Sequence, residues 1–160
     1  MVTYEERLQR IWETPSNLVS QLATVDHKDI GLRYIVTAFI FFLLGGTFAS
    51  LMRVQLAQPE LRVLSPEMYN QIFTMHGVTM IFLFATPMLT GFGNYVLPLM
   101  LGTRDMAFPR LNAFGYWGFL LAGIFMYMSF LTGGAPNVGW FNYVPLSAAS
   151  FSLVHAQDRS

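Results

Sequence analysis

The sequence predicts an all-α integral membrane protein with three membrane-crossing helices. Of the 160 residues, 54% are hydrophobic and only 11% are charged, whereas soluble domains contain about 25% charged residues. Lys, Arg, Asp and Glu are absent from two long stretches, Met68–Thr103 and Leu111–Gln157. The apolar runs are continuous and do not alternate with polar residues, which argues against β-barrel strands.

Three apolar segments approach the length of about 20 residues that a helix needs to cross a bilayer. They cover about residues 34–52, 72–97 and 111–131, and Pro87 predicts a kink in the second. Residues 1–25 are polar and predict an N-terminal arm, after which Asp26 provides N-cap chemistry for the first helix. Residues 26–147 therefore form the expected transmembrane domain, and 148–160 a divergent or truncated tail.

The distribution of cations predicts the orientation. Arg and Lys before the first segment and in the 102–110 loop would share one face, and those in the first interhelical loop the other. Six cations on the first face (Arg7, Arg10, Lys28, Arg33, Arg104 and Arg110) oppose two on the second (Arg53 and Arg62). Because positive residues stay inside, we expect the N-terminus on the cytoplasmic side.

Composition also excludes several functions. There are no cysteines, which rules out disulfides, thiolate metal sites and thiol nucleophiles. The formal net charge is zero, so no nucleic-acid partner is expected. The first 33 residues carry five acidic residues and no long apolar core, unlike a signal or transit peptide.

His76 is the best candidate for a metal ligand. It lies within the uncharged second segment, where an ionisable side chain marks a functional site by default. A neutral imidazole binds heme iron well, and Gly77 would let a flat macrocycle approach the backbone. A histidine that merely hydrogen-bonds between helices explains the pattern equally well, since one histidine specifies neither metal nor heme.

Arg53 ends the first apolar segment at the depth expected for His76. Its guanidinium would either extend to the lipid headgroups or donate to an oxygen of a cofactor. Asp105, Asn94 and Asn112 are expected together at the opposite face. They fit the mouth of a proton path, or else a solvated loop charge and two helix-end amides. Trp140 is by position an interface residue.

Several longer motifs, in order, resemble subunit I of the heme-copper oxidases, with the bacterial cytochrome c oxidases most similar. These are DHKDIG at 26–31, TMHG at 74–77, GFGNY at 91–95 and DMAFPRLN at 105–112, followed by Gly139-Trp140 with Tyr143, Pro145, Leu146 and Ser147. The resemblance covers about residues 24–147 and implies the first three helices of a twelve-helix bundle.

The resemblance implies roles for single residues. His76 corresponds to an axial ligand of the low-spin heme, expected to be a heme a, and Arg53 to the arginine at its formyl group. Trp140 corresponds to a tryptophan near the heme propionates. Asp105 corresponds to the carboxylate at a proton-path entrance, with Asn94 and Asn112 as nearby amides.

The resemblance also implies a function for the complete enzyme. The complete enzyme would pass electrons from cytochrome c through the low-spin heme to a heme–copper centre, where oxygen is reduced to water with proton pumping. Ligands for the second heme and for copper are absent from these 160 residues, so no catalytic residue is assigned and this chain alone is expected to be inactive. The expected setting is the bacterial inner membrane, with lipid and the other oxidase subunits as partners. The alternatives are a quinol oxidase of the same superfamily and a non-catalytic, truncated membrane remnant.

Overall fold

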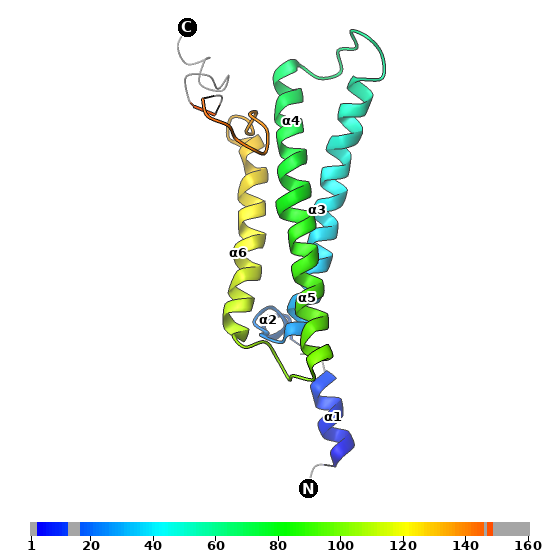
Figure 1. The fold of residues 1–160 in the computed structure, drawn as a ribbon, viewed down its shortest axis with the longest axis vertical. Coiled ribbons are helices and arrows are strands. Elements are labelled where there is room, and N and C mark those ends of the chain that lie inside the picture. The colour runs from blue at the N-terminus through cyan, green and yellow to red at the C-terminus, as the bar shows by residue number, and fades with distance from the viewer. Residues whose placement is uncertain (1–2, 13–16, 146, 149–160) are drawn as a thin grey trace.

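The computed structural model describes residues 3–12, 17–145 and 147–148. All regular structure in these residues is helical, as Figure 1 shows. The elements are α1 (Tyr4–Trp12), α2 (Leu18–Leu22), α3 (His27–Gln55), α4 (Pro66–Val78), η1 (Thr79–Ala85), α5 (Thr86–Leu101), α6 (Pro109–Met128) and η2 (Ser129–Leu131). The predicted all-α fold with three long apolar helices is confirmed.

The helices begin where the sequence places caps, beyond the apolar segments themselves. Asp26 caps α3 by accepting a hydrogen bond from the backbone N–H of Lys28 at 2.8 Å. Ser65 caps α4 by accepting one from the N–H of Met68 at 3.1 Å, and Pro66 follows at the first helical position. Because backbone hydrogen bonding continues through polar residues, α3 begins at His27, well before the apolar segment that starts near Tyr34.

The second span is one long helix with a π-helical turn in its middle. Helix α4 continues through the π-helix η1 into α5, so that residues 66–101 form one rod. The irregular turn lies immediately before Pro87, which lacks an N–H and whose ring would clash with the carbonyl one turn earlier. Thr86 donates its hydroxyl hydrogen bond to the Ile81 carbonyl oxygen at 2.9 Å. The disturbance expected at Pro87 is therefore absorbed in the turn that precedes it.

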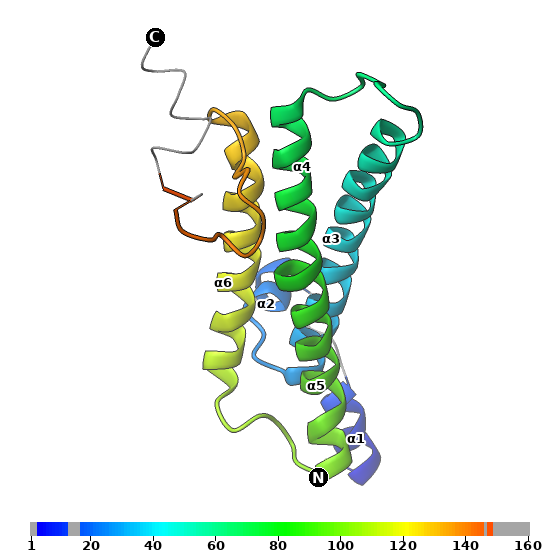
Figure 2. The same ribbon diagram turned by 45° about the horizontal axis from the view of Figure 1, so that its top comes forward.

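Helices α3 and α5 approach each other closely at a pair of glycines, Gly31 and Gly91. A Cβ atom added to Gly91 would lie 2.9 Å from the Gly31 carbonyl oxygen and 2.8 Å from Ile35. Helices in membranes associate through such small residues because close backbone approach replaces the missing hydrophobic driving force. Towards the end that carries the 57–65 loop, α3 and α4 diverge, as Figures 1 and 2 both show.

Helix α6 packs against α3 through aromatic rings. Tyr34 and Tyr116 are buried, with ring centroids 5.2 Å apart and an interplanar angle of 82°. Ile30 completes this buried cluster. The Tyr116 hydroxyl also lies 3.1 Å from the hydroxyl of Thr37, so its polar end is satisfied at a depth where water is scarce.

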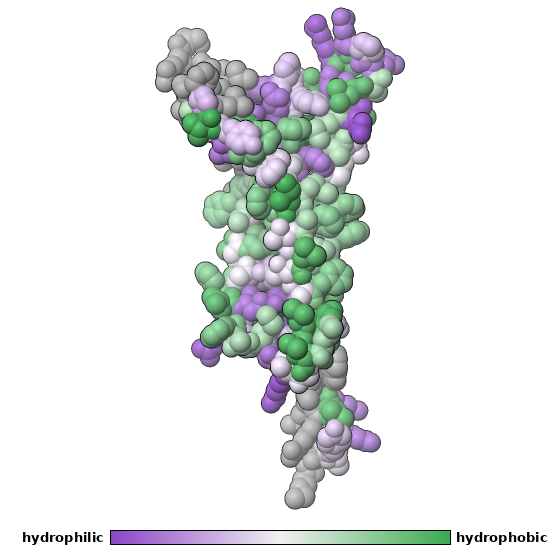
Figure 3. All heavy atoms as spheres, in the orientation of Figure 1, coloured by the Kyte–Doolittle hydropathy of each residue, from purple (hydrophilic) through white to green (hydrophobic). Residues whose placement is uncertain are grey.

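Most apolar side chains point away from the bundle. In the most apolar windows of the three spans, 17%, 33% and 11% of the residues are buried. On the face seen in Figure 3, hydrophobic residues predominate along the middle of the molecule, and hydrophilic residues gather mainly towards its two ends. All three helices are long and apolar enough to cross a membrane, and a lipid environment accounts for these exposed apolar side chains.

Candidate functional site

The predicted site residues form two clusters near opposite ends of the bundle. We call the end that carries α2 and the 102–108 loop the lower end, and the end that carries the 57–65 loop the upper end, as in Figure 1. Asp105, Asn94 and Asn112 belong to the lower cluster. His76 lies in the upper half with Trp140, so the separation in depth that the sequence predicts is present.

His76 is held by a backbone carbonyl of the neighbouring helix. Its Nδ1 atom lies 2.9 Å from the carbonyl oxygen of Gly45 on α3. A carbonyl oxygen can only accept, so Nδ1 carries the proton and donates. The lone pair of the neutral ring is therefore on Nε2, the form that binds a metal through Nε2 with Nδ1–H oriented by a carbonyl.

Gly45 packs closely against the second span. A Cβ atom at that position would lie 2.9 Å from the sulfur of Met80 and 3.2 Å from Thr79. A side chain there would require the flexible Met80 side chain to move. No hydrogen bond or ion pair engages Nε2 of His76 among the described residues. The residues present thus fit one axial ligand of a heme.

Trp140 approaches the same stretch of α4 from the loop after α6. A Cβ atom on Gly77 would lie 3.1 Å from Cδ1 of Trp140, so the indole rests on the backbone beside His76. Trp140 is nevertheless 47% exposed. The structure therefore brings together His76 and Trp140, which are separated by more than sixty residues in the sequence.

Arg53 is exposed near the end of α3 and has no ion pair or hydrogen bond among the described residues. It follows Gly45 by eight residues, which corresponds to roughly 12 Å along the helix axis. The structure therefore places it about two turns above the carbonyl that holds His76. Its long side chain is free to reach back towards that level or outwards to headgroups.

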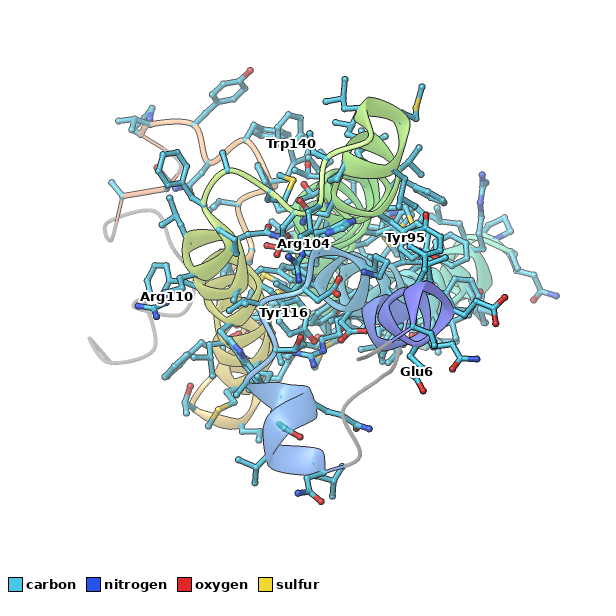
Figure 4. All side chains as sticks on the ribbon, turned by 90° about the horizontal axis from the view of Figure 1, so that it is seen from below. Glu6, Tyr95, Arg104, Arg110, Tyr116 and Trp140 are labelled. Atoms are coloured by element: carbon cyan, nitrogen blue, oxygen red, sulfur yellow. The ribbon has the colours of Figure 1, made fainter. Side chains whose placement is uncertain are left out.

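In the lower cluster, Asp105 faces a histidine and not the neighbouring arginines. Its Oδ1 atom lies 3.3 Å from Nδ1 of His27 and also accepts a hydrogen bond from the N–H of Met106 at 2.7 Å. His27 is 1% exposed, and neither ring nitrogen has a well-aligned hydrogen-bond partner. The 3.3 Å contact is close but off the N–H direction. Figure 4, which looks from below, shows Arg110 at the outer edge of α6.

Asp26 extends this lower cluster at the start of α3. Its Oδ2 atom lies 2.8 Å from Nζ of Lys28, and its Oδ1 atom lies 3.7 Å from the His27 ring. Burial alone would raise the pKa of the Asp26 carboxyl. The hydrogen bonds and charge of Lys28, with a smaller contribution from His27, outweigh burial and lower this pKa below its usual value.

The two predicted amides of the lower cluster contact each other. Asn94 on α5 donates from Nδ2 to Oδ1 of Asn112 on α6 at 2.9 Å. Nδ2 of Asn112 is buried without a hydrogen-bond partner. Buried donors of this kind are ordinarily satisfied by ordered water. The Asn94–Asn112 pair thus joins α5 to α6 through amide groups that donate and accept.

Sequence reasoning missed several residues that shape these clusters. His27 has no role predicted from the sequence, yet it is buried against Asp105. Gly45 has none either, because it contributes a backbone carbonyl to the contact with His76. His27 had a recognisable signal, since it follows the N-cap residue of a membrane-crossing helix, but nothing in the sequence pairs it with a loop almost eighty residues away.

Comparison with known proteins finds a family match over most of the chain. Residues 29–157 match the family described as Cytochrome C and Quinol oxidase polypeptide I. This range extends past Ser147, where the motif resemblance ends. No cluster of three or more His, Cys, Asp or Glu side chains suited to a metal ion occurs in the part of the chain that the structure describes.

Individual relatives are similar over most of the chain. Cytochrome c oxidase subunit 1 of Corynebacterium glutamicum is 52% identical over 132 residues, 82% of this chain and 23% of that protein. The Synechocystis protein of the same name is 53% identical over 126 residues, 79% of this chain and 23% of its own length. That of Alkalihalophilus pseudofirmus is 43% identical over 151 residues, 94% of this chain and 23% of its own length.

The chain spans about a quarter of the length of the curated relatives it matches. The extent of the family match, the level of identity and the three apolar helices all agree. The chain belongs to the cytochrome c and quinol oxidase polypeptide I family of multi-pass membrane proteins.

Proposed function

We propose that these residues form the N-terminal part of a cytochrome c oxidase subunit I. In the complete enzyme, electrons from cytochrome c would reduce oxygen to water at a heme–copper centre, coupled to proton pumping. The relatives above bear the name cytochrome c oxidase subunit 1. The location would be the bacterial plasma membrane, with the N-terminus on the cytoplasmic side and further oxidase subunits as partners.

The observation that carries this proposal is the hydrogen bond from Nδ1 of His76 to the Gly45 carbonyl oxygen. It fixes the tautomer and leaves Nε2 as the metal-binding atom. A low-spin heme, of the a type in our proposal, would supply one-electron transfer when bound there. His76 would provide one axial ligand, Trp140 would contact the heme edge, and Arg53 would donate to a peripheral oxygen.

The lower cluster would take protons from the cytoplasmic side. Asp105 is about one-third exposed and lies beside the buried His27. From there, the Asn94–Asn112 pair would hydrogen-bond to water between the helices. The amide groups do not gain or lose protons at neutral pH and would only orient the water.

A quinol oxidase of the same family remains the second candidate, because the matching family description includes both kinds of enzyme. Docking of the electron donor involves surfaces outside this chain. Oxidation of reduced cytochrome c by the complete enzyme supports the first proposal, whereas oxidation of quinol alone supports the second. A membrane remnant without any cofactor is the third candidate, and heme binding separates it from both.

The test is His76→Ala in the complete subunit, with total heme quantified and a reduced-minus-oxidised spectrum recorded. We expect loss of the low-spin band, because no neighbouring side chain replaces the coordination bond.

Arg53→Met should shift the band and retain the heme, since it removes only a charge-assisted hydrogen bond. His27→Gln, at the opposite end, is the control and should leave the band unchanged. A normal low-spin band in His76→Ala would make His76 a packing histidine and refute the assignment.

A further inference from the structure

Two buried polar side chains on α4 bind the loop that follows η2. Gln71 and Thr74 lie one helical turn apart, and 6% and 2% of their surfaces are exposed. Oε1 of Gln71 accepts a hydrogen bond from the N–H of Ala135 at 3.1 Å. Oγ1 of Thr74 accepts one from the N–H of Gly139 at 2.9 Å and donates to the Asn70 carbonyl oxygen, also at 2.9 Å. Nothing in the proposed function requires either side chain.

These bonds hold the loop at two points that are four residues apart. Ala135 and Gly139 are both buried, and a buried peptide N–H needs a partner. The loop has no helix or strand of its own in this stretch to provide one. Gly134 and Gly139 have φ values of +123° and +82°, a conformation that favours glycine. A Cβ atom on Gly134 would lie 3.2 Å from Nε2 of Gln71.

Trp140 comes directly after the second point of attachment. Its indole lies beside Gly77, the residue after His76, so that a Cβ atom added to Gly77 would lie 3.1 Å from Cδ1 of the indole. Almost half of the side chain is exposed, and its ring contact is with Phe141 of the same loop, at a centroid distance of 6.0 Å. The hydrogen bond from the Gly139 N–H to Oγ1 of Thr74 therefore holds the backbone immediately before the indole.

We propose that Gln71 and Thr74 are positioning residues of the His76 site. They clamp residues 135–139 to α4 and so place Trp140 on Gly77, where the indole forms a wall beside His76. The clamp follows from the contacts of this chain, whereas its effect on a heme rests on the proposed function. The competing explanation is loop packing without influence on the His76 site.

The clamp itself is tested by labelling a cysteine between its two points. The 160 residues contain no cysteine, so Val138→Cys introduces a single site that is followed by mass spectrometry of its peptide. In membranes that contain the complete subunit, Thr74→Val should raise the rate of maleimide labelling about 2- to 10-fold, the range expected for loss of one neutral hydrogen bond. Gln71→Leu should act in the same direction.

Matched controls distinguish the hydrogen bond that Thr74 accepts from the loop from the one that it donates within its own helix. Thr90 donates to the Thr86 carbonyl oxygen at 2.9 Å, just as Thr74 donates to Asn70, but binds no loop. Thr90→Val should leave the labelling rate unchanged. Thr74→Ser retains the hydroxyl and should restore the parent rate. Unchanged labelling in both Thr74→Val and Gln71→Leu overturns the clamp.

The second readout is the low-spin heme of the same variants, by band position and midpoint potential. Thr74→Val should shift both while heme content is retained, and Thr74→Ser and Thr90→Val should match the parent protein. Faster labelling with an unchanged band and potential overturns the positioning role and leaves only loop packing. A normal band in His76→Ala refutes the proposed function, and this inference about the heme with it, whereas the labelling rates decide the clamp separately.

Discussion

At the scale of single residues, Asp26 both caps helix α3 and forms an ion pair. It accepts a hydrogen bond from the N–H of Lys28 and forms an ion pair with the ammonium of the same residue at 2.8 Å. Its lowered pKa means that the folded state stabilises the carboxylate. That contribution is present above the unfolded pKa, about 3.9, and is lost as pH falls through the lowered folded value.

Asp26→Asn should therefore destabilise the protein at neutral pH by at most about 1 kcal/mol, because the pair is partly exposed and an amide still caps the helix. The difference from the parent protein should shrink as pH falls below about 4, where the carboxyl of the unfolded state takes up a proton, and should be lost once pH passes the lowered folded pKa. Thermal unfolding in detergent at a series of pH values measures it. Asp29→Asn, in the same helical turn, is the control. A difference that persists at acidic pH contradicts the role of the charge.

Asp105 is the residue on which the proposed proton path depends. Asp105→Asn keeps the size of the side chain but removes its ability to take up and release a proton. In the complete enzyme we expect slower proton uptake from the cytoplasmic side with normal heme content, since His76 lies in the other half of the bundle. Turnover and proton uptake in liposomes measure the effect, with the exposed Glu60→Gln as a control. Normal pumping and turnover would make Asp105 an ordinary loop charge.

At the scale of the helices, the crossing of α3 and α5 depends on Gly31 and Gly91. The backbone of each glycine lies where a Cβ atom of the other would be. Gly91→Ala would place a Cβ atom 2.8 Å from Ile35 and 2.9 Å from the Gly31 carbonyl oxygen. Relief of this overlap requires backbone movement, and we expect a destabilisation of about 1–3 kcal/mol.

Gly93 on the same helix is the matched control for that substitution. A Cβ atom there would find its nearest neighbour, Leu97 of its own helix, at an ordinary 3.8 Å. Gly93→Ala should thus be neutral or slightly stabilising, because alanine favours helix over glycine. The midpoint of thermal unfolding compares the two variants. Equal changes in the midpoint for Gly91→Ala and Gly93→Ala would show that helix propensity, and not close packing at the crossing, determines the effect on stability.

At the scale of the whole molecule, the prediction is the direction in which the chain crosses the membrane. Four of the described cations, Lys28, Arg33, Arg104 and Arg110, lie at the lower end, while Arg53 and Arg62 lie at the upper end. Figure 4 shows Arg104 and Arg110 in the view of the lower end. The positive-inside rule therefore places the lower end on the cytoplasmic side.

Single cysteines at uncharged positions test this topology without altering the cation count. Val63→Cys and Ala107→Cys lie on exposed loops at the upper and lower ends. An impermeant maleimide added outside intact cells should label position 63 and spare position 107. The opposite pattern would invert the topology and separate Asp105 from the cytoplasmic proton supply.

The sequence by itself determined the helices, their approximate depth and the residue types of both clusters. These properties depend on hydropathy, caps and charge along the chain, which are local. The predicted helices are shorter than the observed ones at every end except the C-terminal end of the third, because hydropathy detects the apolar part of a helix whereas backbone hydrogen bonding continues beyond it. The site roles of His76, Arg53, Trp140, Asp105, Asn94 and Asn112 remain proposals.

Only the tertiary structure decided which residues meet. His27 lies against Asp105, the Gly45 carbonyl oxygen fixes the tautomer of His76, and the side chains of Gln71 and Thr74 hold the loop that carries Trp140. Each contact joins segments on different helices or loops. A hydropathy profile has no information about the rotation of one helix against another, and close approach at glycines such as Gly31 and Gly91 sets that rotation.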